Sequence, residues 1–256
     1  MRVTGLLSSI CICLLFICCN GKNKKVETIE KNIIEENSVV ENDSLNYLIR
    51  DAKGSEKPIL LILMHGFGAN EEDLFPIAAS LPENYIVVTP QAPYKIGNDN
   101  YQWYKNEKDK NGNFSGRKED LDNSIHKIED LIKYLQNEYK IKSDRTFIGG
   151  FSQGANMSYL IGLENPKLVK GIAILSGTIF SRIKNDKKLD KSSGLKIFIG
   201  HGDQDNRIPY SEAETAKKWL EENKYSVDFH TYKGISHSIS EQEINDLAEF
   251  IHKNLE

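Results

Sequence analysis

The sequence predicts an α/β fold with a mostly parallel central sheet, and two observations support this prediction. Continuous apolar runs of strand length recur at residues 58–64, 85–89 and 171–176, as expected for strands that are covered on both faces. Segments with helical periodicity separate these runs, most clearly at residues 119–140. No repeat or internal linker interrupts the alternation, so residues 45–256 are expected to form one domain.

The individual elements follow from local patterns along the chain. Apolar and polar residues alternate over residues 45–50, which indicates an exposed antiparallel strand. The remaining expected strands are residues 58–64, 85–89, 146–149, 171–176, 195–200 and 227–232. Helices are expected from the acidic residues 70–73 onward and at residues 119–140, 155–163, 209–223 and 241–255. Between Pro90 and Gly116 the sequence predicts a long irregular stretch.

The first 44 residues are expected to lie outside the folded domain. Residues 1–19 contain Arg2 and then a short apolar run, which is typical of an export signal. The end of the run is similar to a bacterial lipoprotein signal, with Cys19 as the expected lipidated residue and Cys18 as the alternative. An uncleaved anchor or an ordinary cleaved signal are the other interpretations. Residues 20–44, rich in Lys, Glu and Asn, are expected to form a flexible tether.

These features predict a protein of the bacterial cell envelope, held to a membrane by an N-terminal lipid and located in the periplasm or at the cell surface. The net charge of −4 and the scattered lysines argue against nucleic acid as a partner. All four cysteines lie within residues 1–19, which excludes a disulfide framework or a thiolate metal site in the domain. We expect neither a metal nor a cofactor.

The sequence Gly150-Phe151-Ser152-Gln153-Gly154 stands between an expected strand and an expected helix. A serine between two glycines at such a corner is typical of a nucleophile elbow, in which the chain turns sharply and exposes the serine Oγ. Glycines are needed because larger side chains would collide with the neighbouring strand and helix. Ser152 is therefore the candidate nucleophile, and the Gln153 amide is a candidate donor to a developing oxyanion.

A serine hydroxyl needs a histidine base, and the histidine needs an acceptor that fixes its tautomer. His237 is the candidate base because it follows the last expected strand in a loop. Asp203 and Asp205 follow the preceding strand, and the residues alone barely separate them as candidates for the acid. The order serine, acid, histidine is that of α/β-hydrolases.

Two further loops are candidates for the site. Phe67, in the loop after the first buried strand, is expected to supply the second oxyanion amide. Trp103 and Tyr104 are expected to line the substrate groove, although core packing is the more common fate of such aromatic residues.

These motifs together resemble the phospholipase/carboxylesterase family, which includes acyl-protein thioesterases and small bacterial carboxylesterases. The segments that carry the resemblance are residues 63–68, 90–93, 103–104, 149–154, 201–209 and 234–237. The resemblance implies a single α/β-hydrolase domain with Ser152 as nucleophile, His237 as base and Asp205 as the preferred acid. It also implies oxyanion amides at Phe67 and Gln153. Residues 105–118 form a polar insert where the family varies, which leaves the acyl preference open.

The function expected from this resemblance is hydrolysis of carboxylic esters with short to medium acyl groups, through an acyl-enzyme. The substrate would be a small molecule or an ester linked to a glycan. A carbohydrate acetyl or feruloyl esterase, or a peptidase, on the same fold is the alternative. A surface-binding lipoprotein without catalytic activity is a third interpretation, which the triad order disfavours.

Overall fold

The computed structural model describes residues 45–110, 112–190 and 194–255. The predicted signal at residues 1–19, its Cys19 and the predicted tether at residues 20–44 lie outside the described residues. Within the described ranges, none of the helices combines the length and the apolar character needed to cross a membrane.

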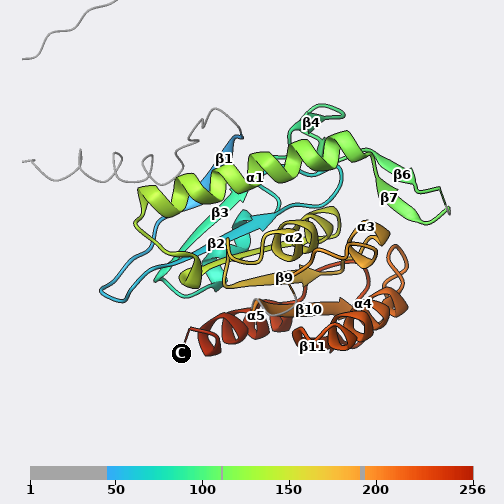
Figure 1. Ribbon diagram of the computed structural model, residues 1–256. Helices are drawn as coiled ribbons and strands as arrows, with labels where there is room; N and C mark the ends of the chain where they lie inside the picture. The colour runs from blue at the N-terminus through green and yellow to red at the C-terminus, as the bar shows by residue number, and fades with distance from the viewer. Residues whose placement is uncertain (1–44, 111, 191–193, 256) are drawn as a thin grey trace, which may run out of the picture. The chain divides into compact units, whose positions relative to one another are not determined.

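A central sheet of seven strands organises the domain, in the order β1-β3-β2-β8-β9-β10-β11 (Figure 1). Its strands are β1 (Tyr47–Arg50), β2 (Ile59–Met64), β3 (Tyr85–Pro90), β8 (Thr146–Phe151), β9 (Gly171–Leu175), β10 (Lys196–Gly202) and β11 (Ser226–Tyr232). Only β1, at one edge of the sheet, runs antiparallel to its neighbour; the other adjacent pairs are parallel. The predicted fold class, a single α/β-hydrolase domain, is confirmed.

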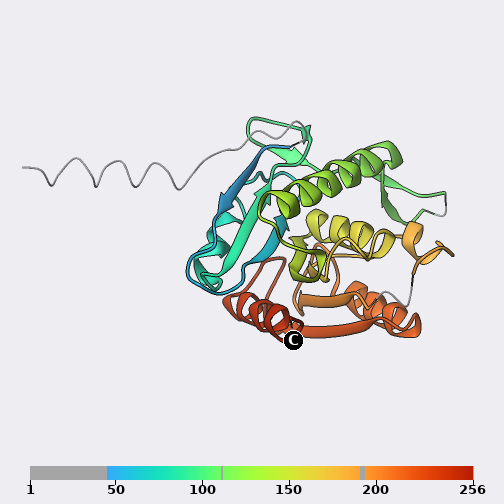
Figure 2. The ribbon, with the colours of Figure 1, turned by 60° about the vertical axis from the view of Figure 1, so that its left-hand side comes forward.

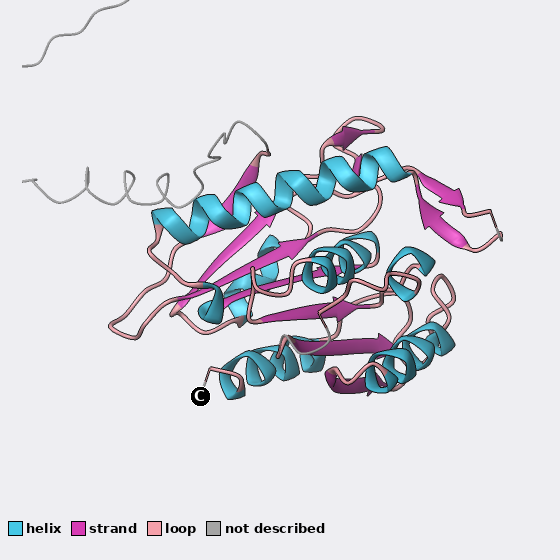
Figure 3. Ribbon diagram, viewed as in Figure 1, coloured by secondary structure: helices cyan, strands magenta, loops and turns pink. Residues whose placement is uncertain are grey.

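Helices cover both faces of this sheet (Figure 2 and Figure 3). They are α1 (Lys118–Glu138), α2 (Gln153–Glu164), α3 (Ser181–Lys184), α4 (Tyr210–Glu222) and α5 (Glu241–Lys253), with 3₁₀ turns η1 (Phe75–Ser80) and η2 (Ser143–Arg145). Buried residues of α1, α2 and α4 belong to one apolar cluster, whereas η1 and α5 contribute to another. The sheet therefore lies between two helical layers.

Successive residues of the central strands supply these two clusters. In β2, Leu60 and Ile62 belong to the cluster under α1 and α2, while Leu61 and Leu63 belong to the cluster under η1 and α5. All four side chains are fully buried. This two-sided burial explains why the strand sequences are continuous apolar runs.

Two local predictions are wrong. The stretch expected to be irregular contains two short antiparallel hairpins, β4 (Tyr94–Lys95) with β5 (Tyr101–Gln102) and β6 (Asn106–Lys108) with β7 (Phe114–Gly116). Their strands are two or three residues long, too short for an apolar alternation to show.

The helix expected to start at residues 70–73 is the second error, because those residues form a turn and the 3₁₀ segment η1 begins only at Phe75. Pro76 gives the reason. In a regular helix that started at residue 70, Pro76 would lie in the interior and remove a backbone hydrogen bond.

Candidate active site

Ser152 occupies the corner between β8 and α2, at the carboxyl end of the sheet. Its backbone has φ 55° and ψ −110°, a conformation that residues with a side chain rarely adopt. The Ser152 N–H donates to the Leu175 carbonyl at 2.9 Å, which fixes the corner to the end of β9. Strain of this kind persists only where the surroundings enforce it.

The flanking glycines are required by the neighbouring strand β2. A Cβ on Gly150 would lie 2.6 Å from the Met64 carbonyl oxygen, and a Cβ on Gly154 would collide with the same carbonyl group. The predicted reason for glycine at these positions, close approach of the backbone, is therefore observed. Main-chain atoms of β2 form the wall against which the elbow rests.

A chain of hydrogen bonds connects Ser152 to His237 and Asp205. His237 Nε2 lies 3.0 Å from Ser152 Oγ, and His237 Nδ1 lies 2.7 Å from Asp205 Oδ2. The His237 ring packs on Phe151, with 4.6 Å between ring centroids. The three residues come from the ends of three different strands, as their order in the sequence predicts.

The Asp205 carboxylate is buried, and both of its oxygens accept hydrogen bonds. Its Oδ1 accepts hydrogen bonds from the backbone N–H groups of Arg207 and Ile208, both at 2.9 Å. Burial alone would raise the pKa of Asp205, but the hydrogen bonds from His237 and from these amides outweigh burial and hold the pKa below its usual value. Asp205 is therefore an anion over the neutral range.

Asp203, the competing acid, has a different role in the structure. Its Oδ1 accepts a hydrogen bond from the Gly234 N–H at 2.6 Å, which ties the loop after β10 to the turn after β11. That turn leads to His237. Of the two acids, the structure places only Asp205 against the histidine.

A cavity of about 700 Å³ opens at Ser152. Both expected oxyanion residues, Phe67 and Gln153, line it. Phe67 is 55% exposed, whereas Gln153 is buried. The remaining wall includes polar side chains from five elements or loops, among them Asn106, Asn156, Lys184, Arg207 and Glu212.

The two aromatic residues expected in the groove are placed differently. Tyr104 lines the cavity, and its hydroxyl accepts a hydrogen bond from Asn156 at 2.8 Å. Trp103 does not line it; the indole is fully buried and donates to the His65 carbonyl at 2.9 Å. The expectation of a groove position for Trp103 is therefore corrected, because its N–H has a partner in the loop after β2.

The Gln153 side chain connects the elbow to the segment at Trp103. Its Oε1 accepts from the Trp103 N–H at 2.9 Å, and its Nε2 donates to the Tyr104 carbonyl at 2.8 Å. Nε2 also lies 3.2 Å from Asn106 Oδ1 at the start of the β6–β7 hairpin. One side chain thus holds the cavity wall in a fixed position relative to Ser152.

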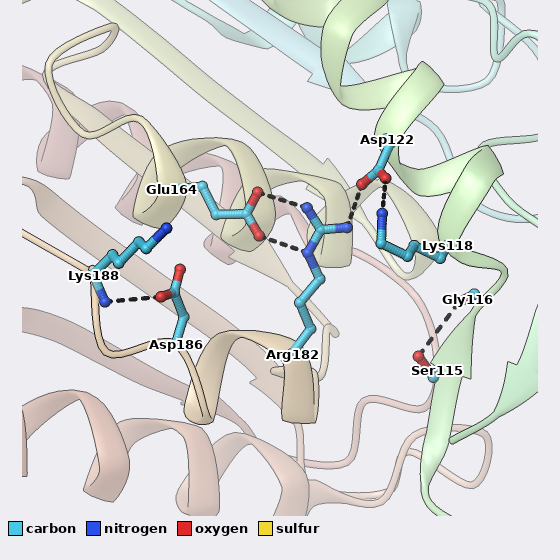
Figure 4. A network of polar contacts seen from close by, with 8 residues as sticks. All are labelled: Ser115, Gly116, Lys118, Asp122, Glu164, Arg182, Asp186 and Lys188. Atoms are coloured by element: carbon cyan, nitrogen blue, oxygen red, sulfur yellow. Dashed lines mark hydrogen bonds and ion pairs between the residues drawn. The ribbon is translucent and has the colours of Figure 1, made fainter. Parts of the chain in front are cut away.

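Arg182 fixes another part of the wall, which α3 supplies, through the contacts drawn in Figure 4. Its guanidinium binds both carboxylate oxygens of Glu164 on α2, at 2.8 and 3.0 Å, and Asp122 on α1 at 2.6 Å. Ser181 and Lys184, on either side of Arg182, line the cavity. Ion pairs in two directions therefore anchor a helix of only four residues.

The sequence did not indicate Arg182 or the role of the Gln153 side chain. Arg182 lies 18 residues from Glu164 and 60 from Asp122, and Gln153 lies about 50 residues from its partners. Such separations leave no periodic pattern in the sequence. The polar insert at residues 105–118 was the one available signal, since its hairpin reaches the cavity through Asn106 and Phe114.

Comparison with known proteins places the chain among hydrolases. The sequence profile described as Phospholipase/Carboxylesterase matches residues 48–255. Acyl-protein thioesterase 1 of Mycosarcoma maydis is 40% identical over 120 residues, which cover 45% of this chain and 50% of that protein. The Saccharomyces cerevisiae protein of the same name is 36% identical over 138 residues, 52% of this chain and 60% of its own. The chain thus spans about half of these relatives.

A solved structure gives the same fold. The carboxylesterase of Bacillus cereus superposes with a TM-score of 0.70, covering 83% of this chain and 96% of that chain at 22% identity. At this identity the similarity shows the fold alone.

Proposed function

The chain belongs to the phospholipase/carboxylesterase family, and we propose that it is a serine hydrolase that cleaves carboxylic esters with short to medium acyl groups. The observation that carries this proposal is the hydrogen-bonded chain from Ser152 Oγ through His237 to Asp205 Oδ2. An ordinary serine hydroxyl is a weak nucleophile, and this arrangement is the one that activates it.

The proposed reaction follows from the geometry. Ser152 Oγ attacks the ester carbonyl while His237 Nε2, 3.0 Å away, takes the hydroxyl proton. The tetrahedral intermediate develops negative charge on the former carbonyl oxygen, which the amides of Phe67 and Gln153 would stabilise. His237 then donates the proton to the leaving alcohol, and the acyl group remains on Ser152.

Water completes the cycle. His237 removes a proton from a water molecule that attacks the acyl-enzyme, and then returns it to Ser152 Oγ as the carboxylic acid leaves. Asp205 stays ionised throughout, since the hydrogen bonds from His237 and from the amides of Arg207 and Ile208 hold its pKa low. Its task is to fix the Nδ1–H tautomer of His237 and to stabilise the imidazolium.

The experiment that tests the proposal is labelling with a fluorophosphonate, together with hydrolysis of p-nitrophenyl butyrate. The wild-type chain should be labelled and active, and Ser152→Ala should be neither. Ser181→Ala is the matched control because Ser181 is the other serine that lines the cavity; it should still be labelled. Labelling that survives Ser152→Ala would refute the assignment.

The polar wall of the cavity favours a second candidate on the same site. Asn106, Lys184, Arg207 and Glu212 line a space much larger than a short acyl chain needs. Such side chains suit a polar leaving group, as in a carbohydrate acetyl or feruloyl esterase. A panel of p-nitrophenyl esters, acetylated and feruloylated sugars, thioesters and aminoacyl amides separates these activities. A surface-binding lipoprotein without activity would show no labelling at all.

We also propose that the chain is exported and attached to a membrane through Cys19. The support is the sequence of residues 1–19 alone. Expression in a bacterium with labelled palmitate should label the wild-type chain and Cys18→Ser, but not Cys19→Ser. Label that disappears only with Cys18→Ser would move the lipid to Cys18, and an unlabelled wild-type chain would contradict the anchor.

A further inference from the structure

A second histidine contacts the acid of the proposed triad. His201 lies near the end of β10, four residues before Asp205, and its side chain is fully buried. It does not line the cavity at Ser152. It therefore lies behind Asp205, where it cannot touch a substrate.

The contacts of His201 define its tautomer. Its Nε2 lies 2.9 Å from the Ile208 carbonyl oxygen and 3.3 Å from Asp205 Oδ2. The hydrogen bond joins Nε2 to the Ile208 carbonyl oxygen, which can only accept, so Nε2 carries the hydrogen and donates it there. Asp205 acts on His201 through its charge. Nδ1 is buried and has no hydrogen-bond partner among the described residues, so a proton there would be unsatisfied. Burial also lowers the pKa of His201, despite the opposing effects of Ile208 and Asp205.

Asp205 accepts hydrogen bonds on both oxygens. Oδ1 accepts from the backbone amides of Arg207 and Ile208, and Oδ2 accepts from His237 at 2.7 Å. The two amides belong to the same loop as the carboxylate. His201 connects that loop to the central sheet, because it belongs to β10 and binds the Ile208 carbonyl.

We infer that His201 is a positioning residue of the site. It fixes the Ile208 carbonyl, and the Ile208 N–H binds Asp205 Oδ1, so that Oδ2 faces His237. The inference rests on the proposed esterase function. It assigns a role to a residue whose His-Gly sequence at a strand end indicates only a turn.

The groups around His201 show which interactions its replacement would change. Asp205, His237 and Glu212 are the charged or titratable residues around it that affect its ionisation, and Tyr210 packs edge-on with ring centroids 6.1 Å apart. Asp205 Oδ2 lies 3.3 Å from Nε2 and acts on His201 through its charge. Removal of the His201 donor should therefore free the Ile208 carbonyl and loosen the loop whose Ile208 amide holds Asp205 Oδ1.

A pair of substitutions in the full chain separates hydrogen bonding from packing. His201→Gln offers a side-chain N–H close to the position of Nε2, whereas His201→Leu fills the space without a donor. We expect kcat for p-nitrophenyl butyrate to fall about tenfold in His201→Leu with little change in KM, as for the loss of one hydrogen bond that leaves a carbonyl without its partner. His201→Gln should recover most of this loss.

A double substitution supplies the readout that a purely structural role would not change. In an Asp205→Asn background, His201→Leu should have almost no further effect on kcat, because the carboxylate that His201 positions is already lost. Equal activity of the two His201 variants, or an undiminished further loss in the Asp205→Asn background, would overturn the inference.

If the proposed esterase function itself is wrong, the experiments give a different result. In that case the wild-type chain itself would lack Ser152-dependent hydrolysis and fluorophosphonate labelling. If His201→Leu does not fold, as judged by circular dichroism, His201→Asn decides in its place. Its shorter amide does not reach the Nε2 position, so activity equal to that of His201→Gln would contradict the inference.

Discussion

Glu243 on α5 gives the most quantitative prediction. The residue is 1% exposed, and neither carboxylate oxygen has a hydrogen-bond partner at normal distance among the described residues. The carboxyl lies against Gly200 of β10, where a Cβ would approach its Cδ to 2.9 Å. Burial raises the pKa of Glu243 from 4.5 to about 8, although the Ser240 backbone opposes the shift. The folded protein therefore keeps this side chain protonated at pH 7.

The consequence for stability follows from proton linkage. Between pH 4.5 and about 8 the folded state retains a proton that the unfolded state has lost, so the free energy of unfolding falls as pH rises. At about 1.36 kcal/mol for each pKa unit, the full loss is about 5 kcal/mol and is complete above the folded pKa. Glu243→Gln removes the titration while keeping the shape, so it should be more stable than wild type at pH 9.

Urea unfolding of the full chain at pH 5 and pH 9 measures the effect. Wild type and Glu243→Gln should have similar midpoints at pH 5 and clearly different midpoints at pH 9. Glu249→Gln is the matched control, because Glu249 lies on the same helix and is exposed; it should follow wild type at both values. A constant difference between wild type and Glu243→Gln would refute the reasoning.

Three further substitutions test the site. Asp205→Asn should lower kcat for p-nitrophenyl butyrate by about four orders of magnitude, because His237 would then adopt the wrong tautomer. Asp203→Asn should lower kcat less than about tenfold. A larger loss in Asp203→Asn than in Asp205→Asn would make Asp203 the acid. Gln153→Met keeps the backbone amide but loses the side-chain hydrogen bonds to the cavity wall, so KM should rise about tenfold with a smaller fall in kcat. An unchanged KM would show that these hydrogen bonds do not position the wall. Gly154→Ala should lower the free energy of unfolding by about 3 kcal/mol or more, measured by urea; wild-type stability would contradict the close approach to β2.

The sequence was sufficient for those features that depend on local patterns. Two-sided burial of β2, β3, β9 and β10 requires apolar residues at successive positions, so continuous runs identified these strands. Ser152, Asp205 and His237 come together because each follows a parallel strand and the strand ends share one edge. The elbow glycines indicated a close approach before the approaching atoms were known.

Other features depend on contacts that have no local signal. The polar β6–β7 hairpin is anchored by Gln153 and by packing of Phe114 on Phe180, so its own residues do not show the pairing. Trp103 is buried because a carbonyl group from a distant loop accepts its N–H. The contact between His201 and Asp205 exists because the loop after β10 folds back on its own strand.

The wall behind the elbow has a consequence for how mutations here can be compensated. A side chain at position 154 collides with main-chain atoms of Met64 and His65, and no substitution elsewhere makes a carbonyl group smaller. Gly162, by contrast, is confined by the side chain of Ile172. We therefore expect a genetic screen to yield second-site suppressors of Gly162→Ala at residue 172, whereas defects at Gly154 should revert only to glycine.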